Sequence, residues 1–316
     1  MSISKKWDYL KTGDIVDIIA TTPGIGIKNL RENLLFLSNL IKSIGLIPRI
    51  NFDAIFLGAD YFSNISLEIR KEELYKALFS NDSKAIWIIR GGYGTSKLLA
   101  RLDKNIAPAA PKLVIGYSDV NCLHLWLNKF WNWPSLHARV LYEFLDNENK
   151  LDFNAVIKII SGKEREVVFH ELVPLNQLAT QKQVIKAVIT GGTIQVIQSG
   201  IGLDWQFNAE NKILFFEEIF DRGVRIDRTL NHFYQLGLFD QVKAIIFGDI
   251  ICGVEANGSE NCDLAVKYFA QNINIPVLSI SGVGHGKYNH PLPLNTESEL
   301  IINPDGIKLS CMTGGE

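Results

Sequence analysis

The sequence predicts an α/β protein, with an N-terminal, mostly parallel sheet flanked by helices and a C-terminal α/β domain with a mixed sheet. Two observations predict this class. Short apolar runs alternate with longer segments whose apolar residues recur at helical spacing, and this alternation is typical of parallel sheets covered by helices. The length of 316 residues is also sufficient for two domains.

The first domain is expected over residues 1–146, as strands that alternate with helices. The expected strands are 15–20, 46–50, 85–89 and 113–115, and the expected helices are 29–44, 67–79, 95–102 and the segment that follows Ser118. Turn residues end two of these strands. Thr21-Thr22-Pro23-Gly24 ends the first, and Arg90-Gly91-Gly92-Tyr93-Gly94 breaks the third sharply.

Residues 147–182 mix charge with short apolar pieces, so we expect a linker with some hairpin structure. The second domain is expected over 183–316. Its expected strands are 184–189, 212–216, 242–247, 277–280 and the pair 300–302 and 307–309, and its expected helices are 193–201, 226–236 and 265–270. Gly191-Gly192-Thr193 is interpreted as a turn.

Composition excludes several classes of function. The net charge is −2 and no basic block is present, so binding to nucleic acid or to a membrane surface has no electrostatic support. No apolar run approaches the roughly 18–20 residues of a membrane span. The N-terminus lacks an apolar signal region, so a cytoplasmic location is expected. The four cysteines show no C-x-x-C pairing and are expected to be reduced, buried thiols.

The most informative stretch is 113–127, in which an apolar strand turns through Gly116-Tyr117-Ser118-Asp119 into an amphipathic helix. Such corners lie at the carboxyl end of a parallel sheet, where ligands bind. A hydroxyl there faces the first N–H groups of the helix, which suits a nucleophilic serine. The alternative is that Ser118 is an N-cap and Asp119 a first-turn acid. The second glycine of the G-x-S-x-G elbow is also absent.

Two further strand ends could complete a set of nucleophile, base and orienting carboxylate. Glu217 ends one strand, and His285 lies between Gly284 and Gly286 after another. The Gly91-Gly92 loop could supply an N–H to an oxyanion together with the N–H of Asp119. The alternatives are first-turn acids at 217 and 218 and a plain loop at 90–94. His285 and His290 share a loop with Pro291, which argues against a zinc pair.

At these residues the sequence resembles the LD-carboxypeptidase family of serine peptidases, which includes the microcin C self-immunity hydrolases. The matching pieces run in order along nearly the whole chain: GDIVDIIATTP, IWIIRGGYGTSKLL, VIGYSDVNCLHLWLN, ITGGTIQVIQSGIG, ILFFEEIFDRGVRIDRTLNHF, IIFGDI and VGHGKYNHPLPL. Two departures stand out. The family often has Gly-Gly-Asn where this chain has Gly191-Gly192-Thr193, and often His-Gly-Pro where it has His137-Ala138-Arg139.

The resemblance implies a set of roles. Its catalytic triad maps onto Ser118, Glu217 and His285, and its oxyanion hole maps onto backbone N–H groups of Gly92 and Asp119. We expect a cytoplasmic homodimer, with the site in a groove between the two domains and with no metal or cofactor. Candidate contacts to the substrate are Arg70, Arg90, Gly91 and Tyr117, with both arginines expected to be exposed and to bind a carboxylate.

The expected activity is removal of the terminal D-alanine from muropeptide tetrapeptides during peptidoglycan recycling. One alternative is an immunity-type hydrolase of peptidyl or aminoacyl nucleotides, which would need an aromatic side chain to stack on the base. The segment 147–182 holds only Phe153 and Phe169 as aromatic residues, which weighs against it. Another alternative is a non-catalytic sensor of wall fragments, against which the intact serine, glutamate and histidine argue.

Overall fold

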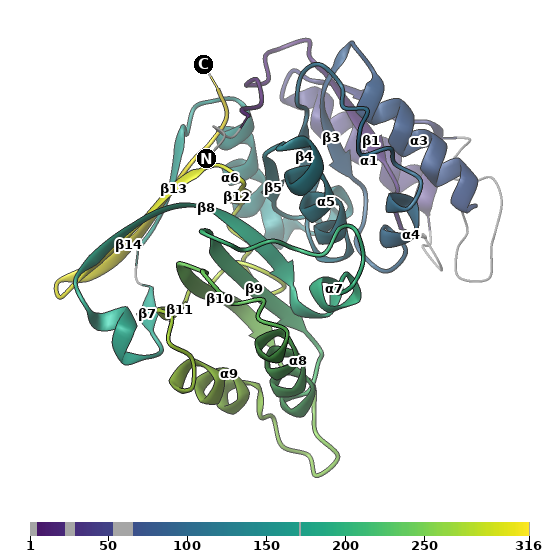
Figure 1. Ribbon diagram of the computed structural model, residues 1–316. Coiled ribbons are helices and arrows are strands. Elements are labelled where there is room, and N and C mark those ends of the chain that lie inside the picture. Colours follow the sequence, from purple (N-terminus) through teal and green to yellow (C-terminus); the bar gives the residue numbers. More distant parts are fainter. Residues whose placement is uncertain (1–4, 23–28, 53–65, 171, 316) are drawn as a thin grey trace. The chain divides into compact units, whose positions relative to one another are not determined.

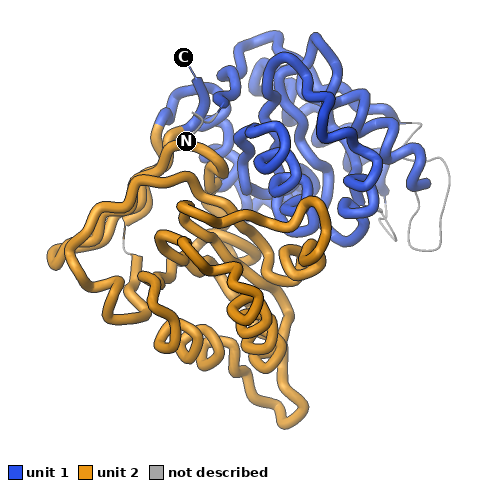
Figure 2. Tube along the Cα trace, viewed as in Figure 1, with its two compact units in different colours: residues 1–165, 313–316 blue, residues 166–312 orange. Residues whose placement is uncertain are grey.

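The computed structural model describes residues 5–22, 29–52, 66–170 and 172–315. The expected turn residues Pro23 and Gly24 lie outside these ranges. The chain forms two compact units, one of residues 1–165 and 313–316 and one of residues 166–312 (Figure 2). We call them unit 1 and unit 2. The predicted fold class is confirmed, because each unit combines helices with a sheet that is mostly parallel in unit 1 and mixed in unit 2.

Unit 1 contains parallel strands in the order β5-β4-β3-β1-β2, with helices packed against them (Figure 1). The strands are β1 (Ile15–Ile19), β2 (Ile47–Arg49), β3 (Ser83–Ile88), β4 (Leu113–Gly116) and β5 (Ser135–His137). The helices are α1 (Leu30–Ser43), α3 (Leu67–Phe79), α4 (Ser96–Leu99), α5 (Asn121–Trp131) and α6 (Lys150–Ile160), with 3₁₀ turns η1 (Ser118–Val120), η2 (Leu141–Leu145) and η3 (Asn147–Asn149). The central strands are almost wholly buried, which explains their continuous apolar sequences.

Unit 2 contains an eight-stranded mixed sheet in the order β6-β14-β13-β8-β9-β10-β11-β7. The strands are β6 (Glu166–Phe169), β7 (Val173–Pro174), β8 (Gln183–Thr193), β9 (Ile213–Ile219), β10 (Ala244–Ile251), β11 (Val277–Ser279), β13 (Glu297–Asn303) and β14 (Gly306–Met312), and β12 (Leu292–Leu294) precedes β13. Strands β8 to β11 are parallel, whereas β8, β13, β14 and β6 pair antiparallel. The remaining elements are η4 (Gln177–Thr180), α7 (Ile194–Ser199), α8 (Gly223–Gln235) and α9 (Cys262–Gln271).

Aromatic side chains fill the core of unit 2 beneath α8 and α9. The Phe216 ring lies 5.6 Å from the Phe247 ring and 6.2 Å from the Phe233 ring, centroid to centroid. All three side chains are at most 1% exposed. This packing holds the carboxyl ends of β9 and β10 side by side, which is where the candidate acidic residues of unit 2 lie.

Three expectations about the elements need correction. The turn predicted at Gly191-Gly192-Thr193 is instead the last part of β8. Glu217 was expected to end its strand but lies inside β9. Residues 147–182, expected as a linker, contain helix α6 in unit 1 and strands β6 and β7 in unit 2.

The cysteine expectation is half correct. Cys122 and Cys311 are buried free thiols, as expected. Cys252 and Cys262 instead form a disulfide, because the loop after β10 returns to the start of α9 and brings the two Cα atoms to 5.7 Å. Within the described ranges, every helix is too short or too polar to cross a lipid bilayer.

Candidate active site

Ser118 lies in a strained conformation directly after β4. Its φ is +63°, in the left-handed region that residues other than glycine seldom adopt. The 3₁₀ turn η1 begins at Ser118 and continues into α5, so the serine occupies a tight strand-to-helix corner. Its side chain is partly exposed, whereas Tyr117 and Asp119 are buried. Strain of this kind costs of order 1–3 kcal/mol and is concentrated at functional sites.

The loop that follows β3 packs closely on this corner. A Cβ placed on Gly91 would lie 3.1 Å from the Ser118 Cβ and 3.3 Å from its Oγ, so only glycine leaves that space open. The Thr22 hydroxyl donates to the carbonyl oxygens of Arg90 and Gly91, at 3.0 and 2.7 Å. Thr22 therefore holds the loop against the serine.

Two backbone N–H groups at this corner fit the expected oxyanion donors. In the described part of unit 1, neither the Gly92 N–H nor the Asp119 N–H donates to another backbone carbonyl. Gly92 has a φ of +130°, which a side chain would disfavour. The Asp119 carboxylate accepts from the Thr95 N–H at 2.7 Å, which anchors the start of η1. Burial raises the pKa of Asp119, and hydrogen bonds from Thr95 and Gly94 oppose the rise.

In unit 2 the structure brings Glu217 and His285 together. The His285 Nδ1 lies 2.6 Å from the Glu217 Oε2. The Glu217 side chain is fully buried, and that of His285 is 9% exposed. Since Nδ1 donates its proton to the carboxylate, the lone pair of the neutral imidazole is on Nε2, where it can accept a proton from a hydroxyl. The pair therefore has the geometry of a general base held by an orienting carboxylate.

The loop that carries His285 lies directly on β10. A Cβ on Gly286 would lie 2.2 Å from the Asp249 Oδ2, and one on Gly284 would lie 3.0 Å from the Glu217 Cβ. The Gly284 N–H donates to the Asn289 side chain at 3.1 Å, and the Asp249 N–H donates to the Val283 carbonyl at 2.8 Å. These glycines are required for close approach, because any side chain would push the imidazole away from Glu217.

A second carboxylate, Glu218, lies next to the pair. It is 1% exposed and accepts from the N–H groups of Gln195 and Ile219, both at 2.8 Å. Burial raises its pKa to about 7, those two hydrogen bonds lower it, and the nearby charges of Glu217 and Asp221 raise it further. Glu218 thereby ties the end of β9 to the start of α7.

The predicted substrate contacts have different environments. Arg70 was expected to be exposed and is not: it is 2% exposed and donates to the Thr21 carbonyl at 3.0 Å, because helix α3 packs against β1. Arg90 is partly exposed, as is Gly91. Tyr117 is 4% exposed, and its hydroxyl donates to the Glu143 carboxylate at 2.8 Å. Tyr117 thus packs inside unit 1.

Two threonines that contact the candidate residues were missed in the sequence. Thr22 was interpreted only as a turn residue, and Thr193 as a turn residue, as the start of a helix and as a departure from the family pattern. Thr193 Oγ1 is hydrogen-bonded to Glu217 Oε1. One signal could have identified it: polar residues at 193 and 217 each follow an apolar run that is expected as a strand, and the carboxyl ends of parallel strands meet at the same sheet edge.

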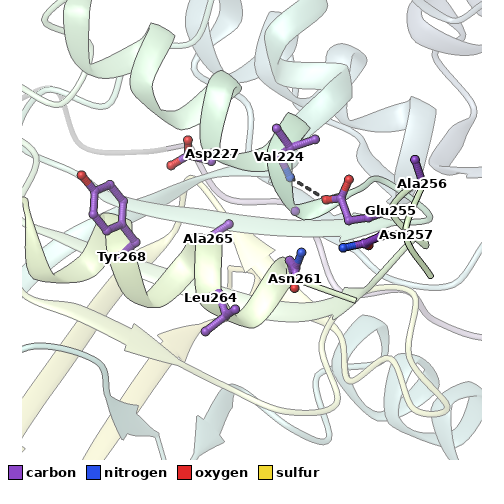
Figure 3. A pocket seen from close by; sticks show the side chains of 10 residues that line it. Val224, Asp227, Glu255, Ala256, Asn257, Asn261, Leu264, Ala265 and Tyr268 are labelled. Carbon is purple, nitrogen blue, oxygen red and sulfur yellow. Dashed lines mark hydrogen bonds between the residues drawn. The ribbon is translucent and has the colours of Figure 1, made fainter. Parts of the chain in front are cut away.

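A pocket of unit 2 contains none of the predicted site residues. It lies between α8 and α9 and the loop before α9, with a volume of about 750 Å³ (Figure 3). Val224, Leu264 and Tyr268 give it apolar walls, and the Glu255 carboxylate accepts from the Val224 N–H at 2.9 Å. Ser118, Glu217 and His285 are all absent from its lining.

Comparison with known proteins identifies the class. Residues 16–138 match the N-terminal domain, and residues 186–300 the C-terminal domain, of LD-carboxypeptidases. The chain belongs to the LD-carboxypeptidase family, and its class is that of serine-type carboxypeptidases.

Particular relatives agree with this assignment. The chain is 34% identical to a putative carboxypeptidase, RC0549, from Rickettsia conorii, over 90% of this chain and 88% of that protein. It is 24% identical to a probable murein peptide carboxypeptidase from Bacillus subtilis, over 95% and 92%. The crystal structure of an MccF-like protein from Bacillus anthracis has the same fold, with a TM-score of 0.81, 19% identity and coverage of 99% of this chain and 100% of that one.

Proposed function

We propose that the protein is a serine LD-carboxypeptidase that removes the terminal D-alanine from muropeptide tetrapeptides during peptidoglycan recycling. Ser118 is the nucleophile, His285 the general base and Glu217 the carboxylate that orients the imidazole. The observation that carries this proposal is the 2.6 Å contact between the His285 Nδ1 and the Glu217 Oε2, which leaves Nε2 to accept the proton of a serine hydroxyl. The strained, partly exposed Ser118 supports the role of nucleophile.

The reaction proceeds through an acyl-enzyme. Ser118 Oγ attacks the carbonyl carbon of the residue before D-alanine while His285 takes the hydroxyl proton, and the oxyanion is held by the N–H groups of Gly92 and Asp119. Collapse of this intermediate breaks the C–N bond, and His285 gives the proton to the departing amine of D-alanine. Water, deprotonated by His285, then attacks the ester and releases the shortened peptide. Glu217 stabilises the imidazolium in both steps.

Arg90 is the proposed contact for the carboxylate of the leaving D-alanine. Its backbone is fixed by Thr22, it is partly exposed, and it directly precedes the glycine that packs on Ser118. A guanidinium matches a carboxylate in shape and charge. An Arg90→Ala variant should raise KM far more than it lowers kcat, because the contact forms already in the bound substrate.

Mass spectrometry of a purified muropeptide tetrapeptide incubated with the protein tests the activity. Loss of one terminal alanine is expected with the native chain and with a Ser43→Ala control. Ser43 is exposed, and its hydroxyl donates to the Leu40 carbonyl within the same helix. A Ser118→Ala variant should fold normally and leave the tetrapeptide intact. Near-normal turnover by that variant would exclude the acyl-enzyme.

Two parallel experiments, an incubation with an aminoacyl-sulfamoyl nucleotide and a calorimetric titration with the tetrapeptide, distinguish the alternatives. Cleavage of an aminoacyl-sulfamoyl nucleotide, with the tetrapeptide untouched, would identify an immunity-type hydrolase. Calorimetric binding of tetrapeptide without release of alanine would identify a sensor of wall fragments. A cytoplasmic setting and a homodimer are also proposed, on the family resemblance. Light scattering of the purified protein tests the dimer, and a monomer mass would contradict it.

A further inference from the structure

We propose that Thr193 is a positioning residue for the catalytic pair: its hydroxyl fixes the Glu217 carboxylate so that the other oxygen of that carboxylate faces His285. This inference rests on the proposed function. Thr193 Oγ1 is hydrogen-bonded to Glu217 Oε1, while Glu217 Oε2 is bonded to His285 Nδ1. The two donors therefore hold opposite oxygens of one carboxylate, which fixes the plane of the group as well as its place.

The backbone places Thr193 for this contact. Thr193 is the last residue of β8 and is paired in register with Glu217 of β9. Just before it, a Cβ on Gly191 would lie 1.9 Å from the Phe215 carbonyl oxygen, so only glycine fits beside β9 at that position. Gly191 and Gly192 both have a positive φ, at 132° and 142°. The backbone of β8 directly before Thr193 therefore depends on glycine, and it is this backbone that places the threonine opposite Glu217.

The charges around Glu217 explain why such a donor matters. Glu217 is fully buried, and the carboxylates of Glu218 and Asp249 both lie close enough to interact with its charge. Two neighbouring acids disfavour an anion at 217, and burial disfavours it further. Donors from Thr193 and His285 oppose both effects, because each satisfies a lone pair of the anion.

Removing the hydroxyl has a definite chemical consequence. Without Thr193 Oγ1, more of the negative charge of Glu217 is concentrated on Oε2, so protonated His285 is held more strongly. The carboxylate also gains freedom to rotate, so Nε2 is aimed less accurately at the attacking hydroxyl. Both changes act on the transition state and neither touches the substrate. We therefore expect kcat to fall while KM stays constant.

The experiment compares two variants with a matched control in the full chain. Thr193→Val removes the hydroxyl at constant shape, and Thr193→Ser retains it. Thr190→Val is the control, since Thr190 is equally buried in the same strand but is paired with Leu214. We expect kcat for the tetrapeptide to fall about tenfold or more in Thr193→Val, with the acid limb of its pH–rate profile moved to higher pH. Thr193→Ser and Thr190→Val should stay near the native rate.

A second readout does not need activity. The proton between His285 Nδ1 and Glu217 Oε2 should give a low-field NMR signal in ¹⁵N-histidine-labelled protein, and Thr193→Val should shift it while Thr190→Val does not. If the native chain cleaves no tetrapeptide but this shift is seen, the proposed function fails and the positioning role holds. An unchanged signal in Thr193→Val, or equal loss of kcat in Thr193→Ser, would overturn the positioning role.

Discussion

Gly91 faces Ser118 so closely that a single methyl group on Gly91 would contact both the Cβ and the Oγ of the serine, at 3.1 and 3.3 Å. The first prediction follows from this contact. Gly91→Ala should lower kcat by about 10- to 100-fold, because the serine hydroxyl must rotate away from its reactive position. Unfolding in urea should change little, since φ at residue 91 is not positive. Unchanged kcat would show that the hydroxyl points elsewhere.

The strain at Ser118 predicts that two inactive variants differ in stability. Ser118→Gly should be more stable than Ser118→Ala by about 1 kcal/mol, because glycine adopts a φ of +63° without a steric penalty and alanine does not. Both variants should be inactive. Urea unfolding of the two variants measures the difference. Equal stabilities would mean that the corner relaxes when the hydroxyl is removed.

Glu217→Gln tests the orientation of His285. The amide can present an N–H to Nδ1, which favours the tautomer that carries its proton on Nε2 and so removes the base. We expect kcat to fall by about 10³- to 10⁴-fold, as for the equivalent change in other triads. Far-ultraviolet circular dichroism checks that the fold is intact. A fall of less than tenfold would assign the orienting role to another group.

Glu218 predicts a pH dependence of stability. Its pKa in the folded chain is about 7, against an ordinary value of 4.5, so the folded state binds the proton more tightly. The contribution of protonated Glu218 to the free energy of unfolding is therefore fully present below about pH 4.5. It is lost as the pH rises through 7, and the loss is roughly 3 kcal/mol at most. The difference in unfolding free energy between the native chain and Glu218→Gln should change across this window. A difference that stays constant from pH 4.5 to 8 would contradict the assignment.

The disulfide predicts a response to reductant. The bond between Cys252 and Cys262 closes a loop of ten residues' separation, and its loss should destabilise the chain by roughly 2–3 kcal/mol. Native protein in reductant should then unfold at the same urea concentration as the Cys252→Ala/Cys262→Ala variant. Thiol titration in denaturant alone should find two reactive thiols of the four cysteines. Four reactive thiols would exclude the bond.

Much of the fold could be predicted from the periodic spacing of apolar residues in the sequence. The helix at Leu67–Phe79 was predicted with its observed bounds, and the antiparallel pair β13 and β14 was predicted from its turn sequence. The turn predicted at 191–193 was wrong for a physical reason. A Gly-Gly pair usually marks a turn, but here Gly191 lets β8 approach the backbone of β9, and that closeness depends on a strand far along the chain.

Only part of the candidate site could be predicted from the sequence. Ser118, Glu217 and His285 could be proposed because each comes after an apolar run in the sequence and because the family resemblance assigns them roles. Glu217 and His285 are 68 residues apart, so sequence alone gives no distance between them. The burial of Arg70 was missed because the many charged residues of helix α3 predict a solvent-exposed helix. One face of this helix nevertheless packs on the sheet.

Because Gly191 has no side chain, we expect the protein to be unusually sensitive to substitution at this position. No atom of that residue would take part in the proposed chemistry, yet the smallest possible addition there would collide with the Phe215 carbonyl and force two strands apart. Thr193 would then lose its hydrogen bond to the Glu217 carboxylate. In a mutational scan, we would expect substitutions at Gly191 to reduce activity as severely as substitutions of the proposed reacting groups.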